Sequence, residues 1–130
     1  MIIDTSAIIA ILRDEPDAMT CARAIANATI RRLSAVNFVE SAVVIDASGD
    51  PIAKRRFDDF IREAGISIDP VTKVQAQIAR DAYRDFGRGS GHPARLNFGD
   101  CFAYALAKES GEPLLFKGVD FTHTDIVAVK

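Results

Sequence analysis

Apolar residues along this chain repeat in two ways, and the two repeats alternate. Short runs typical of buried strands lie at residues 1–4, 32–34, 66–68, 114–116 and 126–129. Between these runs, apolar positions recur every three or four residues, which is the spacing of a helix face. Strands that alternate with helices form crossover units in which the strands are parallel. We therefore expect an α/β fold, a three-layer α/β/α sandwich around a central, mainly parallel sheet.

The expected helices are bounded by capping residues and by breakers. The first is capped by Thr5 or Ser6 and ends before Pro16. Further helical patterns cover residues 17–28, 36–48, 51–65, 72–87 and 99–110. A glycine-rich stretch at residues 87–98 predicts the one long loop.

Two of these helices carry enough apolar residues to predict deep burial. The 36–48 helix is expected to be largely buried through six residues: Val36, Phe38, Val39, Ala42, Val43 and Ile45. The helix capped by Thr72 is expected to turn four residues inward: Val74, Ile78, Ala82 and Tyr83.

Composition mainly limits the compartment and the partners. The chain is long enough for one domain, 1–130, that buries roughly two thirds of its unfolded surface. Its apolar share is 48%, but no apolar run is long enough to span a bilayer, so no membrane partner is expected.

Because Met1 leads straight into the first strand, a signal peptide has no room, and we expect a cytoplasmic protein with Cys21 and Cys101 reduced. The net charge of −2 means that a polyanion would have to bind at local basic patches.

Four acidic residues interrupt apolar segments or stand at the ends of elements: Asp4, Glu40, Asp100 and Asp120. Each has an ordinary structural interpretation when taken alone. Glu40 suits a half-exposed helix position or an ion pair, Asp100 suits a helix cap or an acid in the first turn favoured by the helix dipole, and Asp120 suits a turn. Asp4 is harder to explain in this way, because it follows a buried strand directly at the sheet edge where α/β proteins bind ligands.

Together the four acids indicate a metal site. The crossover topology brings the ends of the first and last strands and the starts of the following helices to one edge of the sheet. Carboxylates gathered there repel one another, and a divalent cation relieves the repulsion. Oxygen ligands without His or Cys at suitable spacing favour Mg²⁺, with Mn²⁺ as a substitute. Such a site is suited to attack of water on a phosphodiester.

At these residues the chain resembles a known family. The opening Ile2-Ile3-Asp4-Thr5-Ser6, Glu40 in its helix, the segment from Leu96 to Cys101 and the segment from Leu114 to Phe121 are similar to those of PIN-domain ribonucleases, specifically VapC-type toxins. The similarity spans essentially the whole chain. It implies a PIN-like fold, endonucleolytic cleavage of structured RNA such as tRNA or ribosomal RNA, a homodimer, and a VapB-type antitoxin as partner.

The resemblance also assigns the site. The metal ligands and their supporting residues are then Asp4, Glu40, Asp100, Asp120, Ser6 and Asn97. Many relatives carry an Asp where this chain has Gly118, two positions before Asp120, so the fourth ligand stays open.

Basic residues near the expected site provide candidates for RNA contacts. Arg88, Arg95 and Lys117 lie in or near the glycine-rich loop and after the 114–116 strand, where they can hold phosphates without reading sequence. Arg80 and Arg84 interleave with acids, and a solvated helix face explains them equally well.

Two other functions compete with the nuclease. A phosphoacceptor receiver domain has a similar length and alternation, with Lys117 as its terminal lysine, but Asp4 lacks an acidic neighbour and the best acceptor candidate, Asp69, is followed by Pro70. A non-catalytic PIN-fold module that binds RNA or a partner is the other alternative, and the intact Asp4, Glu40 and Asp100 count against it.

Overall fold

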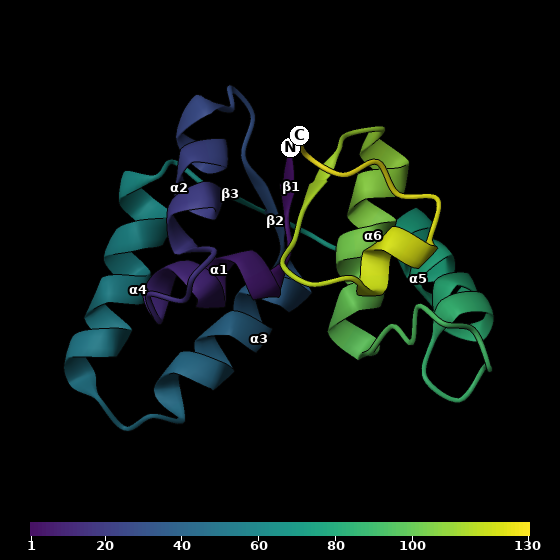
Figure 1. Ribbon diagram of the computed structural model, residues 1–130, viewed down its shortest axis with the longest axis horizontal. Coiled ribbons are helices and arrows are strands. Elements are labelled where there is room, and N and C mark those ends of the chain that lie inside the picture. The colour runs from purple at the N-terminus through teal and green to yellow at the C-terminus, as the bar shows by residue number, and fades with distance from the viewer.

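The computed structural model, which describes residues 1–130, places a parallel sheet between two groups of helices (Figure 1). The strands are β1 (Ile2–Ile3), β2 (Arg32–Ser34), β3 (Ser67–Asp69) and β4 (Leu114–Leu115). They are ordered β3-β2-β1-β4, and all neighbouring pairs are parallel. The helices are α1 (Thr5–Leu12), α2 (Ala18–Asn27), α3 (Ala35–Asp46), α4 (Pro51–Glu63), α5 (Lys73–Phe86), α6 (Phe98–Ser110) and the 3₁₀ helix η1 (Asp120–His123).

The sheet separates two apolar cores, because successive side chains of a strand point to opposite faces. Ile2 and Leu114 belong to the core under α5 and α6, whereas Ile3 and Leu115 belong to the core formed with α1, α2 and α4. Figure 1 shows the same division, with α1 to α4 on one side of the strands and α5 and α6 on the other. The predicted three-layer α/β/α architecture is therefore confirmed. No helix combines the length and the hydropathy needed to cross a bilayer.

The predicted last strand is reduced to a single bridge. Ala128 pairs with Leu114 alone, through hydrogen bonds of 2.9 Å from Leu114 N–H to the Val127 carbonyl and 3.0 Å from Val129 N–H to the Leu114 carbonyl. Just before it, the Asp125 carboxylate accepts hydrogen bonds from side chains of α6. The chain is thus held on α6 until shortly before Ala128, which leaves few residues to pair with β4.

The prediction of a largely buried helix was only partly right for α3, where Ile45 is buried and Phe38 and Ala42 pack against the core. Its buried residues are Asn37, Ser41 and Ile45, whereas Val39 and Val43 are 57% and 61% exposed. The inward face is polar because it meets α1 and α6 through hydrogen bonds. One of these joins Asn37 Nδ2 to the carbonyl of Gly99 on α6 at 3.0 Å. Periodicity located the helix but placed Val39 and Val43 on the wrong face.

The inward face of α5 was also only partly predicted. Ala82 is buried, but Val74 and Tyr83 are 58% and 45% exposed, and Gln75 and Ala79 take the inner positions. Close packing between α5 and α6 favours small side chains at their contact, which explains the two alanines. Thr72 caps α5 as predicted, since its hydroxyl accepts a hydrogen bond from Gln75 N–H at 3.1 Å.

Candidate metal centre

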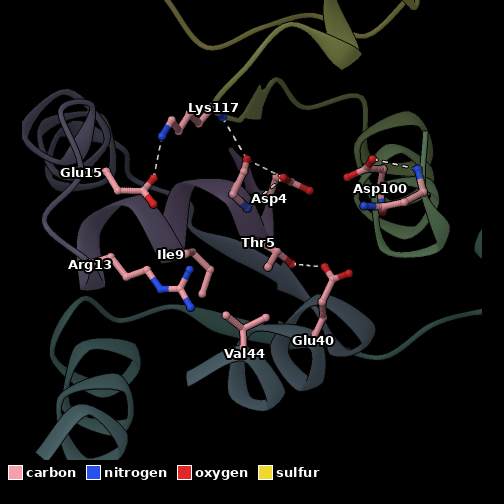
Figure 2. Close-up of a pocket in the computed structure, with 11 residues that line it drawn as sticks. Asp4, Thr5, Ile9, Arg13, Glu15, Glu40, Val44, Asp100 and Lys117 are labelled. Carbon is pink, nitrogen blue, oxygen red and sulfur yellow. Dashed lines mark hydrogen bonds and ion pairs between the residues drawn. The ribbon is translucent and has the colours of Figure 1, made fainter. Parts of the chain in front are cut away.

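A polar cleft of about 390 Å³ opens beyond the carboxyl ends of β1 and β4 (Figure 2). Its lining comes from α1, α3, the start of α6 and the segment after β4: Asp4, Thr5, Ser6, Ile9, Arg13, Glu15, Glu40, Val44, Asn97, Asp100 and Lys117. Only Ile9 and Val44 are apolar. The structure thus brings three of the four predicted acids, together with Ser6, Asn97 and Lys117, to one cleft.

Asp4 directs its two carboxylate oxygens to different surroundings. It is the N-cap of α1, and Oδ2 accepts hydrogen bonds from Ser6 N–H at 3.0 Å and from Ser6 Oγ at 2.6 Å. The cap is therefore Asp4, not Thr5 or Ser6 as expected from the sequence. Oδ1 is buried and has no hydrogen-bond partner. Burial raises the pKa of Asp4, because a charged carboxylate loses its hydration there.

Ser6 links Asp4 to the last strand. Its hydroxyl donates to Asp4 and accepts a hydrogen bond of 2.9 Å from Lys117 N–H, just beyond β4. The carboxylate of Asp4 is therefore held by both neighbouring segments of the sheet edge.

Asp100 follows the same pattern as Asp4. It forms a capping box with Asn97: Asn97 Oδ1 accepts from Asp100 N–H at 2.8 Å, and Asp100 Oδ2 accepts from Asn97 N–H at 2.9 Å. The other carboxylate oxygen is not used by the cap. Burial, followed by the negative charge of Asp4, raises the pKa of Asp100 to about 7. The capping role and the position at the cleft, alternatives for the sequence alone, occur together in the structure.

Glu40 reaches the cleft from α3 and is held by hydrogen bonds from two other polar side chains. Oε1 accepts from Thr5 Oγ1 at 2.5 Å and from Asn37 Nδ2 at 3.5 Å. Figure 2 shows the Thr5 hydroxyl directed at this carboxylate from α1. The charge of Glu40 raises the pKa of both Asp4 and Asp100, so the three acids are electrostatically coupled.

The remaining predicted site residues lie outside this arrangement or at its margin. Asp120 begins η1, is exposed and does not line the cleft, although its charge contributes to the raised pKa of Asp100. Arg88 and Arg95 are exposed on the glycine-rich loop and do not line the cleft either. Lys117 lines it, but its Nζ is paired with Glu15 Oε1 at 2.7 Å.

Sequence reasoning missed four residues that shape the site: Thr5, Arg13, Glu15 and Asn37. Asn37 carried a usable signal, because it is a polar residue in an apolar helix one turn before Glu40. Arg13 and Glu15 gave no local signal, since an exposed helix end explains both equally well. Figure 2 shows the Arg13 guanidinium extending beside Ile9 and Val44 into the cleft, and it forms no ion pair.

The donor set suits a hard divalent cation. No group of three or more His, Cys, Asp or Glu side chains is arranged to hold a metal ion with the present side-chain positions. The carboxylates that face the cleft nevertheless offer oxygen donors of the kind that Mg²⁺ and Mn²⁺ prefer. The unpartnered Oδ1 of Asp4 is the strongest indication, because a buried polar atom without a partner is costly and a cation satisfies it.

The sequence model of the PIN domain matches residues 1–127 of this chain. The chain belongs to the PIN-domain family. Ribonuclease VapC28 of Mycobacterium tuberculosis is 60% identical to it over 126 residues, which cover 97% of this chain and 95% of that protein. The PIN-domain assignment also excludes the receiver-domain alternative. Asp69, the best phosphoacceptor candidate under that alternative, ends β3, accepts a hydrogen bond from Ser67 and has a carboxylate oxygen 3.7 Å from the Arg32 guanidinium.

Solved structures show the same fold at much lower identity. The crystal structure of Mycobacterium tuberculosis VapC20, described as a toxin that cleaves the sarcin-ricin loop, superposes with a TM-score of 0.78 at 17% identity and covers 99% of this chain and 98% of that one. A chain from a toxin–antitoxin complex of Klebsiella pneumoniae has a TM-score of 0.73 at 15% identity, and the match covers 98% of this chain and 94% of that one. The sheet and helix arrangement therefore persists where little sequence is shared.

Proposed function

We propose that this PIN-domain protein is a Mg²⁺-dependent endoribonuclease and the toxin of a VapBC-type toxin–antitoxin pair, active in the cytoplasm on structured RNA such as tRNA or ribosomal RNA. One observation carries the proposal. Asp4 and Asp100 each use one carboxylate oxygen to cap a helix, and at Asp4 the remaining oxygen is buried in the cleft without a partner. The 60% identity to a protein named as a VapC ribonuclease supports the same activity.

Asp4, Glu40 and Asp100 would hold the cation, with Asp120 as a further candidate from η1. When bound, Mg²⁺ supplies an activated water for attack on the phosphodiester and positive charge for the leaving oxygen. The Ser6 hydroxyl orients Asp4 and the Asn97 backbone N–H orients Asp100 through the hydrogen bonds described above. Thr5 donates to Glu40 and fixes the direction from which that carboxylate reaches the cleft.

Cations at the cleft would hold the RNA backbone. Arg13 lines the cleft and is not engaged in an ion pair, so its guanidinium is available to a phosphate. The ion pair with Glu15 holds Lys117 in place, and this favours a role for Lys117 in shaping the cleft. Lys117 would bind a phosphate only if RNA displaced Glu15. Arg88 and Arg95, on the exposed loop before α6, would contact phosphates farther along the strand.

The first test is cleavage of a pool of total tRNA and ribosomal RNA by the purified protein with Mg²⁺. Discrete fragments are expected, and they should disappear with a chelator and in an Asp100→Asn variant, which keeps the capping acceptor but loses the charge. Folded, antitoxin-free protein that leaves the pool intact would favour the alternative of a non-catalytic module that binds RNA or a partner.

A homodimer through the outer face of α3 is part of the proposal. A shallow apolar groove of about 580 Å³ is lined by Ala35, Val36, Val39, Glu40, Val43, Val44 and Phe98. A second groove, between α5 and α6, shares Phe98, which is 68% exposed. A ring that projects between two apolar grooves suits a twofold interface, since each copy offers both the ring and a groove to receive it.

The antitoxin would bind at the groove between α1 and α4. This groove of about 530 Å³ has apolar Ile11, Leu12, Phe60 and Ala64 and charged Arg56, Asp59 and Glu63. An apolar groove with charges of both signs fits an amphipathic helix from a partner. Its lining shares no residue with the two grooves of the proposed dimer, so a bound antitoxin would leave the dimer interface free.

A further inference from the structure

Gly99 occupies a position where the backbone itself does not require glycine. It is the second residue of α6 and has an ordinary negative φ, unlike the six glycines of this chain with positive φ. Glycine in a helix is less favourable than alanine by up to about 1 kcal/mol. A physical reason for Gly99 must therefore come from its surroundings.

The reason is the carboxylate of Glu40. A Cβ atom built on Gly99 would lie 2.2 Å from Glu40 Oε2, 2.4 Å from Oε1 and 2.5 Å from Cδ. These separations are far below any van der Waals contact, so Glu40 can keep its present position only while residue 99 has no side chain.

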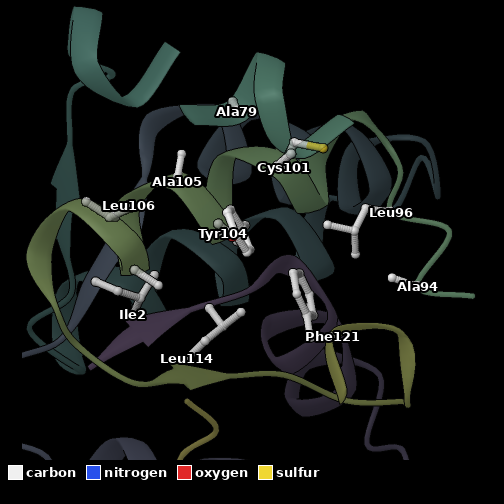
Figure 3. Close-up of a cluster of buried hydrophobic side chains, with 13 residues drawn as sticks. Ile2, Ala79, Ala94, Leu96, Cys101, Tyr104, Ala105, Leu106, Leu114 and Phe121 are labelled. Atoms are coloured by element: carbon white, nitrogen blue, oxygen red, sulfur yellow. The ribbon is translucent and has the colours of Figure 1, made fainter. Parts of the chain in front are cut away.

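The backbone at Gly99 is also held in place. Its carbonyl accepts a 3.0 Å hydrogen bond from Asn37 Nδ2, and the same amide contacts Thr5 Oγ1 and Glu40 Oε1. Figure 3 shows the following turns of α6 packed in the core through Cys101, Tyr104 and Leu106. The helix is therefore unable to move away from an added methyl group, whereas Glu40 is a flexible, half-buried side chain that can rotate.

We propose that Gly99 is a positioning residue: by lacking a side chain, it admits the Glu40 carboxylate to the place between Thr5, Asn37 and α6 from which Glu40 faces the cleft. This inference rests on the proposed function, in which Glu40 is one of the groups that hold the divalent cation. It assigns a role in the site to a residue that touches neither metal nor RNA.

Gly99→Ala tests the proposal, because its effects on stability and on the site should have opposite signs. Melting in EDTA should occur at or above the wild-type temperature, since alanine favours the helix and only the end of a flexible side chain must move. Calorimetric titration with Mn²⁺ should nevertheless show an affinity lower by about 10- to 100-fold, the usual effect of misplacing a group that supports a metal ligand. Mg²⁺-dependent RNA cleavage should fall in parallel.

The control is the same substitution in a Glu40→Ala background. If Gly99 acts through Glu40, then Gly99→Ala should cause no further loss of Mn²⁺ affinity once Glu40 is gone. Wild-type affinity in Gly99→Ala, or an equal loss in both backgrounds, would overturn the positioning role while leaving the proposed nuclease intact. A wild-type protein that neither binds Mn²⁺ nor cleaves RNA would overturn the nuclease and this inference together.

Discussion

At the scale of single residues, the site is built from acids that also cap helices. Asp4 is the N-cap of α1 and accepts from Ser6 N–H through Oδ2, and Asp100, in the first turn of α6, accepts through Oδ2 from the N–H of the N-cap residue Asn97. A helix N-terminus favours a negative charge, which partly offsets the cost of burying these carboxylates. These backbone hydrogen bonds also orient the side chain and, together with the Ser6 hydroxyl at Asp4, direct the second oxygen. The same arrangement serves local folding and the chemistry of the cleft.

Replacing Asp4 should separate its charge from its role as a cap. Asp4→Asn keeps an acceptor for Ser6 N–H, so the metal-free protein should melt no lower than wild type, because an expensive buried charge is removed. Asp4→Ala should lose about 1 kcal/mol of stability with the cap. The rate of RNA cleavage should fall by at least about a hundredfold in both variants, because losing a metal ligand costs more than losing a residue that supports one.

Asp17→Asn is a matched control for both substitutions. Asp17 also precedes a helix, but it is exposed and its side chain makes no capping hydrogen bond. Melting temperature and cleavage should both stay at wild-type values. An Asp4→Asn variant that still cleaves RNA at the wild-type rate would remove Asp4 from the proposed ligands.

The raised pKa of Asp100 predicts that the free energy of unfolding of the metal-free protein falls as pH rises. The pKa of its carboxyl in the folded protein is raised to about 7, above the ordinary value of 3.8. The folded state therefore binds this proton more tightly than the unfolded chain, and the resulting stabilisation is lost as pH rises through about 7. In EDTA, the melting temperature should be lower at about pH 8 than at about pH 5, and Asp100→Asn should flatten that dependence.

The Asp100 carboxyl should also make the metal affinity depend on pH, but in the opposite direction, because the affinity should rise with pH where the stability of the metal-free protein falls. Mg²⁺ must displace the proton on Asp100, so the apparent affinity should fall by about tenfold for each pH unit below about pH 7 and level off above it. Titration calorimetry across this range measures the effect. Affinity that is independent of pH would show that Asp100 does not exchange its proton for the cation.

At the scale of elements, α3 is unusual because polar residues lie on its inward face and valines lie on its outward face. Its polar residues Asn37 and Ser41 face the protein, while Val39 and Val43 face outward. Asn37 Nδ2 donates to the Gly99 carbonyl at 3.0 Å and Ser41 Oγ donates to the Asn37 carbonyl at 2.8 Å, whereas Asn37 Oδ1 is buried without a partner. One helix thus supplies Glu40 and its supporting residue Asn37 on one side and an apolar surface on the other.

Val39→Asp should break the proposed dimer without unfolding the chain. A charge placed in an apolar interface costs about 2 kcal/mol or more, which is roughly a thirtyfold increase in Kd. Light scattering coupled to size exclusion, over a dilution series, should show a shift toward monomer. Ile52→Asp on α4 is the control, because Ile52 is 70% exposed and lies outside the α3 grooves. A wild-type protein that is monomeric at high concentration would exclude the interface.

At the scale of the whole molecule, the cleft shares an element with each of the two proposed interfaces, whereas the two interfaces share no lining residue with each other. The cleft is at the sheet edge, the dimer grooves involve α3, α5 and α6, and the proposed antitoxin groove lies between α1 and α4. Because α1 contributes to both the cleft and the antitoxin groove, a bound antitoxin is well placed to affect Asp4 and Arg13 at the two ends of that helix.

Leu12→Asp should therefore release the protein from its antitoxin while leaving its activity intact. Leu12 lines the α1–α4 groove and does not line the cleft. We expect loss of co-purification with a co-expressed antitoxin, together with RNA cleavage close to the wild-type rate. Val74→Asp, at an exposed apolar residue of α5, serves as the control. Undiminished antitoxin binding by Leu12→Asp would move the docking site elsewhere.

Local patterns in the sequence determined the fold class, because strand and helix periodicity depends only on neighbouring residues. They also located Asp4, Glu40 and Asp100, since a carboxylate next to an apolar segment conflicts with burial wherever that segment packs. The same patterns misassigned Val39 and Val74. An apolar residue in a helical pattern does not by itself show that the fold will bury it, because many apolar side chains stay on the surface of a folded chain.

Only the tertiary structure decided which groups share the cleft and how each is held. Arg13 and Gly99 carry no distinctive local signal of a role in the site, and Asn37 shows only that a polar residue interrupts an apolar helix. Asn37 and Gly99 lie 62 positions apart and meet through a single hydrogen bond between two helices. The packing of α1, α3 and α6 sets these distances, and packing depends on the summed fit of many side chains. The sequence therefore identified the acids, whereas the arrangement that directs them into one site arises from the fold as a whole.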